Sequence, residues 1–194
     1  LLRFDIVTAH LATGLLFFCS MVAIGGFLQP YQGTGVAGNL YWYSSVAAVC
    51  VYLQSVLGAL VASRWAVHQC LDGSQLCQVL HGHMLNAIPV GLSVLVLVFK
   101  AWRVPALHPG LRRLFQLAFG LLLLQMLVGL STLRLQLRVE WITISHQAIA
   151  ASLFGTLVSL NLLALPHRWQ ADHQLPPDPF PRPPTSPARP SAHP

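Results

Sequence analysis

Long runs of apolar residues, separated by short polar connections, dominate the chain, and five of them are long enough to cross a membrane as helices. At 1.5 Å per residue, about 20 residues span the ~30 Å of hydrocarbon in a bilayer. The five predicted helices cover residues 6–28, 40–63, 80–102, 111–133 and 141–165. The pattern therefore predicts an all-α integral membrane protein with five transmembrane helices.

Composition supports this fold class. Hydrophobic residues make up 55% of the chain and charged residues only 8%, a balance that a water-exposed surface does not tolerate. Residues 166–194 are rich in proline and poor in apolar residues, so we expect a disordered tail there. The formal net charge is +6, but basic residues in a membrane protein mark its cytoplasmic loops, and we expect no nucleic-acid partner.

Basic residues also predict the orientation of the helices. Four of them surround the connection between the third and fourth helices: Lys100, Arg103, Arg112 and Arg113. Positive and negative charges nearly cancel on the other side, so this connection and the C-terminal tail are expected to be cytoplasmic. We expect a bacterial-type inner (plasma) membrane, or an equivalent one, with lipid around the helices. Residues 64–79 then face the outside, where a disulfide can persist.

A short repeat links the second and fourth helices. Gln54-Ser-Val-Leu-Gly58 recurs 71 residues later as Gln125-Met-Leu-Val-Gly129. His83 follows Gln54 by 29 residues and His146 follows Gln125 by 21, and the difference of eight is the length of the segment from Cys70 to Cys77. The last four helices are therefore predicted to form a pseudo-repeated four-helix bundle, with the cysteine segment inserted in the first copy.

Three histidines, His10, His83 and His146, lie a few residues inside helices that start from the outer side, which places them at similar depth. An ionisable side chain at that depth needs a partner. Haem iron can be that partner, because two histidines on facing helices can hold a haem from both sides. A histidine hydrogen-bonded across helices is the alternative for each one alone. The corresponding places of His83 and His146 in the repeat favour a ligand pair, so the four-helix bundle is predicted to be a haem-binding bundle.

His81 competes with His83 as the ligand. It lies two residues upstream, on the opposite side of a helix turn and nearer to water. His83 is preferred because its depth is closer to that of His146 and because Pro89 could kink the helix around a bulky ligand. The remaining histidines are expected to be solvated: His68, His108, His167, His173 and His193.

Cys70 and Cys77 lie in the outward connection with six residues between them. A disulfide that closes a short loop is the preferred interpretation, and it could form a lid over the site or be redox-active. A zinc site that recruits His68 or His81 is the alternative, although the spacing matches no standard zinc signature.

Arg134 and Arg138 follow the end of the fourth helix on the outer side. They could pair with haem propionates, or they could extend to the membrane interface as long basic side chains often do.

Several of these motifs resemble the haem A synthase family. Residues 54–63 (QSVLGALVAS), the cysteine segment before His83, and Ile144-Ser-His-Gln-Ala148 are similar to the C-terminal half of that family. Ala9-His10-Leu11 is similar to the last helix of its N-terminal half. The family has eight helices in two pseudo-symmetric halves and oxidises a methyl group of haem O to the formyl group of haem A, for use in terminal oxidases.

The resemblance implies roles for single residues. His83 and His146 would bind the iron of haem b, Cys70 and Cys77 would be the outer cysteine pair, and His10 would bind the substrate haem. It also implies three regions. Residues 1–39 would be the last helix of a truncated N-terminal half with its connection, residues 40–165 the C-terminal bundle, and residues 166–194 the tail.

We therefore expect an oxidoreductase of haem A biosynthesis and cytochrome oxidase assembly. Because three helices of the family's N-terminal half are missing, this chain alone is not expected to be active. Expected partners are haem O, the enzyme that makes it, and an electron donor that the sequence does not identify; the chain could also form a homo-oligomer. The alternatives are a membrane b-type cytochrome that only carries electrons, and a haem-free transporter or assembly factor.

Overall fold

A computed structural model describes residues 4–28, 39–62, 75–105, 107–135 and 138–165. These residues form five α-helices, all of them long and apolar enough to cross a membrane. Their bounds are α1 (Phe4–Leu28), α2 (Leu40–Ala62), α4 (Gln75–Trp102), α5 (Pro109–Arg134) and α6 (Glu140–Leu163). The predicted fold class of five apolar helices is confirmed.

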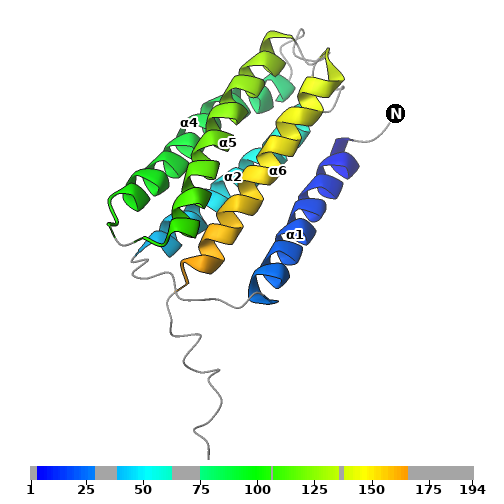
Figure 1. The fold of residues 1–194 in the computed structure, drawn as a ribbon. Helices are drawn as coiled ribbons and strands as arrows, with labels where there is room; N and C mark the ends of the chain where they lie inside the picture. The colour runs from blue at the N-terminus through cyan, green and yellow to red at the C-terminus, as the bar shows by residue number, and fades with distance from the viewer. Residues whose placement is uncertain (1–3, 29–38, 63–74, 106, 136–137, 166–194) are drawn as a thin grey trace, which may run out of the picture.

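Four of the helices form a bundle, and α1 packs on its outside (Figure 1). Helix α2 contacts α4 and α6, and α5 contacts the same two helices, so the four close into a ring. Helix α1 contacts α6 and α2. The bundle consists of two helix pairs, α2 with α4 and α5 with α6, which agrees with the two copies predicted from the repeat.

The side-chain core fills only one end of this bundle. Its most buried residues lie toward the end of α4, the start of α5 and the second half of α6, among them Leu97, Phe115 and Leu157. Hydrogen bonds join α2 and α6 at this end, where the side-chain amide of Asn161 donates to the hydroxyl of Ser44 (3.3 Å) and to that of Ser45. The opposite half of the bundle is left for a cavity.

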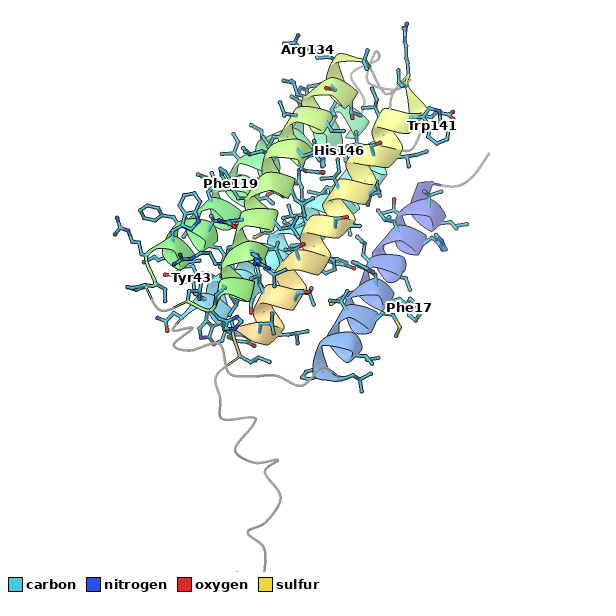
Figure 2. The ribbon with its side chains drawn as sticks, in the orientation of Figure 1. Phe17, Tyr43, Phe119, Arg134, Trp141 and His146 are labelled. Atoms are coloured by element: carbon cyan, nitrogen blue, oxygen red, sulfur yellow. The ribbon has the colours of Figure 1, made fainter. Side chains whose placement is uncertain are left out.

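Small residues allow α1 to lie close to α6. A Cβ atom placed on Gly155 of α6 would stand 2.8 Å from the ring of Phe18, and one on Gly26 of α1 would stand 3.0 Å from the side chain of Leu162. Both distances are shorter than normal carbon contacts, so a larger residue at either position would require Phe18 or Leu162 to shift. Phe17, next to Phe18, points away from the bundle (Figure 2).

The start of α4 differs from the prediction. The helix begins at Gln75 rather than near residue 80, so Cys77 belongs to its first turn and not to a loop. Apolar residues dominate the sequence only after this point, which is why hydropathy alone placed the boundary too late. Helix α4 runs through Pro89, whose side chain lies in an exposed groove with Trp42 and Val96 and does not line the histidine cavity.

Candidate functional site

A cavity of about 500 Å³ occupies the half of the bundle that the core leaves free. All four bundle helices contribute to its wall, and Val7 and Leu11 of α1 complete one side. Most of the wall is apolar. The polar side chains in it gather around two histidines: Gln54, Ser55, His83, Gln125, Thr132, Thr143, His146 and Gln147.

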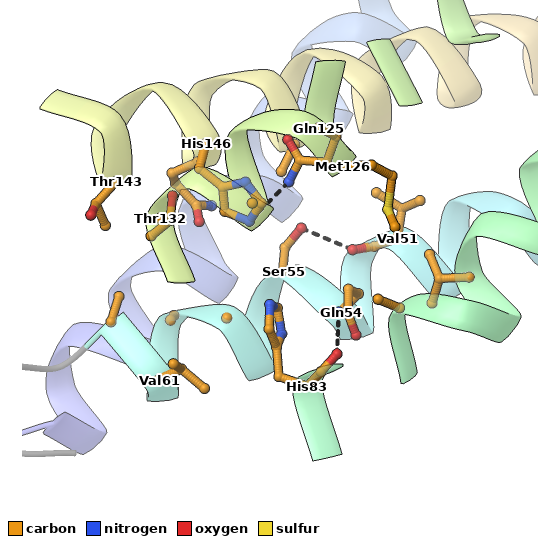
Figure 3. A pocket seen from close by; sticks show the side chains of 18 of the residues that line it. Val51, Gln54, Ser55, Val61, His83, Gln125, Met126, Thr132, Thr143 and His146 are labelled. Atoms are coloured by element: carbon orange, nitrogen blue, oxygen red, sulfur yellow. Dashed lines mark hydrogen bonds between the residues drawn. The ribbon is translucent and has the colours of Figure 1, made fainter. Parts of the chain in front are cut away.

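His83 and His146 both line this cavity, although they are far apart in sequence. His83 comes from the first half of α4 and His146 from the first half of α6. Figure 3 shows the two imidazole rings on facing walls, directed toward the same space, with Ser55 of α2 between them. The hydroxyl of Ser55 donates to the backbone carbonyl of Val51 (2.8 Å), which keeps it bound to its own helix. The structure therefore brings together the two histidines that the repeat predicted to correspond.

Each imidazole lies against a glycine of the preceding helix. A Cβ atom on Gly58 of α2 would stand 3.0 Å from Cε1 of His83, and one on Gly129 of α5 would stand 2.8 Å from Cε1 of His146. These are the glycines that end the two copies of the Gln-x-x-x-Gly repeat. Glycine at both positions makes room for a ring that a larger residue would push into the cavity.

The glutamines that begin the two copies also contact the histidines. The amide nitrogen of Gln54 donates to the backbone carbonyl of His83 (2.8 Å), and its oxygen accepts from the side chain of Asn86 (2.9 Å). The amide nitrogen of Gln125 lies 3.3 Å from Nε2 of His146. The repeat therefore places a glutamine and a glycine around each histidine.

Several buried polar atoms at this site have no hydrogen-bond partner. Five side-chain atoms of the described residues are in this state: Nδ1 of His83, Oε1 of Gln125, Oγ1 of Thr143, Nδ1 of His146 and Nε2 of Gln147. All five residues line the histidine cavity. Buried polar groups without partners are rare and costly, so their concentration here indicates a wall suited to a ligand with polar groups of its own.

Two facing imidazoles suit a particular kind of metal group. No group of three or more histidine, cysteine, aspartate or glutamate side chains that could hold a metal ion occurs among the residues that the structure describes. A bare zinc ion takes at least three protein ligands. Haem iron needs only axial ligands from the protein, because the porphyrin supplies the other four. The donor set and the largely apolar cavity around it fit a haem.

The other predicted ligands lie apart from this cavity. His81 is exposed and does not line it, so among the two candidates on α4 only His83 faces His146. His10 is also exposed, on α1, with its neighbour Leu11 in the cavity wall instead. Exposure of His108 agrees with the expectation of a solvated residue.

Arg134 lies at the end of α5 (Figure 2). Both Arg134 and Arg138 are exposed, and neither lines the cavity. The predicted disulfide cannot be compared with the structure. Cys70 and the side chain of Cys77 lie outside the described residues, as does His68. Cys19 and Cys50, which are described, are free.

Sequence reasoning missed the polar residues around His146. Thr143 and Gln147 lie one helical turn apart on α6 and line the cavity with it. The sequence could have indicated them, because both are polar residues that flank the candidate ligand His146 within a predicted transmembrane helix. Asn86, three residues after His83, carried the same signal.

The fold and the site define a multi-pass membrane protein whose four-helix bundle encloses a cavity with two facing histidines. The chain belongs to the COX15-CtaA family of cytochrome oxidase assembly proteins, whose model matches residues 4–158. No curated protein and no solved structure matches the chain in the other two comparisons. Membership confirms the resemblance seen in the sequence and gives the chain a role in cytochrome oxidase assembly.

Proposed function

We propose that this chain takes part in haem A synthesis, the oxidation of a methyl group of haem O to the formyl group of haem A. In this proposal His83 and His146 are the axial ligands of a haem b. The observation that carries it is the pair of imidazoles that face one cavity from corresponding positions of a repeat. Family membership supports the wider role in oxidase assembly.

A haem held by His83 and His146 would supply one-electron transfer. The chain's own residues hold and shield that group. Gly58 and Gly129 leave room for the two rings, and Val51, Leu122 and Leu153 close the inner end of the cavity with apolar side chains. Removal of water from this space keeps the iron site in a low-dielectric environment.

The substrate haem would bind elsewhere. Oxidation of a methyl to a formyl group with water as the oxygen source (R–CH3 + H2O → R–CHO + 4 H⁺ + 4 e⁻) releases four electrons, so the unidentified redox partner would have to accept electrons rather than donate them. His10 is exposed on α1 and does not line the His83 and His146 cavity, so a haem bound by His10 would be a second one. We propose His10 as the ligand of the substrate haem on this basis.

The visible spectrum of the purified chain tests the haem site. We expect bands of a six-coordinate, low-spin haem in the wild type and their loss or conversion to high-spin bands in His83→Ala and in His146→Ala. His81→Ala is the matched control, because this histidine lies on the same helix two residues away but outside the cavity wall. Absence of haem, or bands unchanged by both cavity substitutions, would refute the proposed site.

A membrane b-type cytochrome that only carries electrons would give the same spectrum. Pigment extraction separates the two functions. Cells that make haem O should accumulate haem A when this chain is produced together with an N-terminal half-bundle of the family, and His10→Ala should abolish the product while leaving the haem b bands intact. A stable haem b without haem A would favour the electron carrier.

A further inference from the structure

The two glutamines of the repeat use their amides differently. The nitrogen of Gln54 donates to the backbone of His83 and its oxygen accepts from Asn86, so both ends of this amide are satisfied away from the imidazole. The nitrogen of Gln125 points instead at Nε2 of His146, and its oxygen is buried without a partner. Equivalent positions of the repeat thus surround the two histidines unequally.

One substitution between the copies accounts for this difference. Asn86 follows His83 by three residues, and the residue three positions after His146 is Ile149. Asn86 can hold the oxygen of Gln54, which turns the Gln54 nitrogen toward the backbone carbonyl. Isoleucine has no group to hold the oxygen of Gln125, and that amide turns to the ring.

The consequence for His146 is chemical. With the ring proton on Nδ1, Nε2 of His146 accepts from the Gln125 amide with its lone pair, and with the proton on Nε2 it donates to that amide instead, so the side chain of Gln125 engages Nε2 in both tautomers. An imidazole binds iron through the same kind of lone pair. The side chain of Gln125 therefore engages the atom that His146 would offer to a metal, whereas the side chain of Gln54 bonds to the backbone of His83 and leaves its ring to backbone contacts.

We propose that the two histidines take up haem in a fixed order, His83 first and His146 second, with Asn86, Gln54 and Gln125 as the positioning residues that set it. This inference rests on the haem site proposed above. Binding of His146 would exchange the hydrogen bond between Gln125 and Nε2 for one N–Fe bond, with the ring proton on Nδ1 and no change of oxidation state. The unpartnered oxygen of Gln125 leaves that amide weakly held, so the exchange is feasible.

Rapid mixing of the full chain, purified from haem-deficient cells, with ferric haem b tests the order. We expect two phases in the wild type, a five-coordinate high-spin species and then a six-coordinate low-spin one. His146→Ala should keep the first phase at the wild-type rate and stop there. His83→Ala should bind haem about tenfold more slowly or worse, because its only remaining ligand is engaged by Gln125; a hydrogen bond of ordinary strength corresponds to roughly that factor.

Two further variants test the positioning residues. Gln125→Met keeps the side-chain volume and removes the donor, so the second phase should accelerate about tenfold while the first is unchanged. Asn86→Leu frees the oxygen of Gln54 and should slow the first phase, as Gln54 becomes able to turn toward the ring. Ser93→Ala is the control on α4, because its hydroxyl bonds only to the backbone of Val90 and lies outside the cavity.

The possible results are distinct. Equal rates for His83→Ala and His146→Ala, or a Gln125→Met variant with an unchanged second phase, would overturn the fixed order while the haem site stands. Failure of the wild type to bind haem would overturn the haem site itself and the order with it. Near-ultraviolet circular dichroism of each variant, compared with the wild type, shows whether a slow phase reflects misfolding.

Discussion

Gly129 lies directly against the ring of His146, so that a Cβ atom on Gly129 would stand 2.8 Å from Cε1 of the imidazole. The same contact recurs between Gly58 and His83 at 3.0 Å. Carbon atoms do not approach so closely without displacement. Each glycine therefore fixes how far its imidazole can withdraw from the cavity, and the position of both rings depends on the absence of two methyl groups.

Gly129→Ala should displace the His146 imidazole toward the cavity and weaken haem binding. Added methyl groups at tight contacts cost about 1–3 kcal/mol, which corresponds to a loss of haem affinity of roughly tenfold or more. Titration of the apoprotein with haem b measures this change. Gly58→Ala should act in the same direction through His83.

Gly120→Ala is the matched control on the same helix. Nothing lies within 4 Å of a Cβ atom at that position, and alanine favours helix over glycine by about 1 kcal/mol. Stability should therefore rise slightly and haem affinity should not change. Equal affinities for Gly120→Ala and Gly129→Ala would show that the glycine contact with His146 is unimportant.

The repeat carried most of what the sequence could predict about this site. Gln54 to Gly58 and Gln125 to Gly129 were recognisable as copies, and the pairing of His83 with His146 followed from them. The direction of each glutamine amide could not be predicted, because it depends on a residue of the neighbouring helix. That residue is Asn86, three residues after His83, for Gln54 and Ile149, three residues after His146, for Gln125. Side-chain contacts between different helices leave no periodic pattern in the sequence from which they could be predicted.

Depth alone was a poor guide to which polar residues line the cavity. Hydropathy placed His10 at the level of His83, but it says nothing about which face of α1 turns to the bundle, and His10 turned out to be exposed. Arg134 lies off the cavity wall, and its pairing with a haem propionate stays a prediction. The packing of helices against one another decides which face of each helix turns to the bundle. For α1, the contact of Phe18 with Gly155 of α6 is an example.

Asn161→Leu should lower stability without altering the haem spectrum. Its amide joins α6 to Ser44 and Ser45 of α2 at the end of the bundle that holds the core. Hydrogen bonds between membrane helices contribute about 0.6 kcal/mol on average and up to about 1.7, so a reduction of this order is expected. Thermal unfolding in detergent measures it, and Ser20→Ala, which removes only an exposed bond to Leu16, serves as the control.

Gly155→Leu should separate α1 from α6, because a side chain there has no room beside Phe18. A pair of cysteines introduced on facing positions of α1 and α6 should cross-link less efficiently in this variant than in the wild type. Gly14→Leu, at a position of α1 with open space around it, should leave the yield unchanged. The haem bands should survive Gly155→Leu if the four-helix bundle holds its ligand without α1.

Removal of haem should lower the thermal stability of the wild type. It should not change the stability of a double variant that carries both His83→Ala and His146→Ala. A ligand present at about 100 times its dissociation constant stabilises the folded state by roughly 2.7 kcal/mol. For a chain of this size that is a shift of about 5–10 °C in the unfolding midpoint. Equal midpoints for the wild type with and without added haem would contradict a specific site.

The orientation of the helices in the membrane is a prediction from charge that labelling can test. Lys100, Arg103, Arg112 and Arg113 flank the connection between α4 and α5, which should be cytoplasmic. In a cysteine-free background, a cysteine in place of His108 should react with an impermeant thiol reagent only after the cells are opened. His108 suits this test because it is exposed at the start of α5.

A cysteine in place of Arg138, in the connection between α5 and α6, should react in intact cells. Arg138 is exposed, as His108 is. A difference in labelling between positions 108 and 138 would therefore reflect the side of the membrane and not the accessibility of the side chain. Since α5 is a single helix long enough to cross the bilayer, the two cysteines must label oppositely. The reversed pattern would put the histidine cavity near the cytoplasmic face and overturn the predicted orientation.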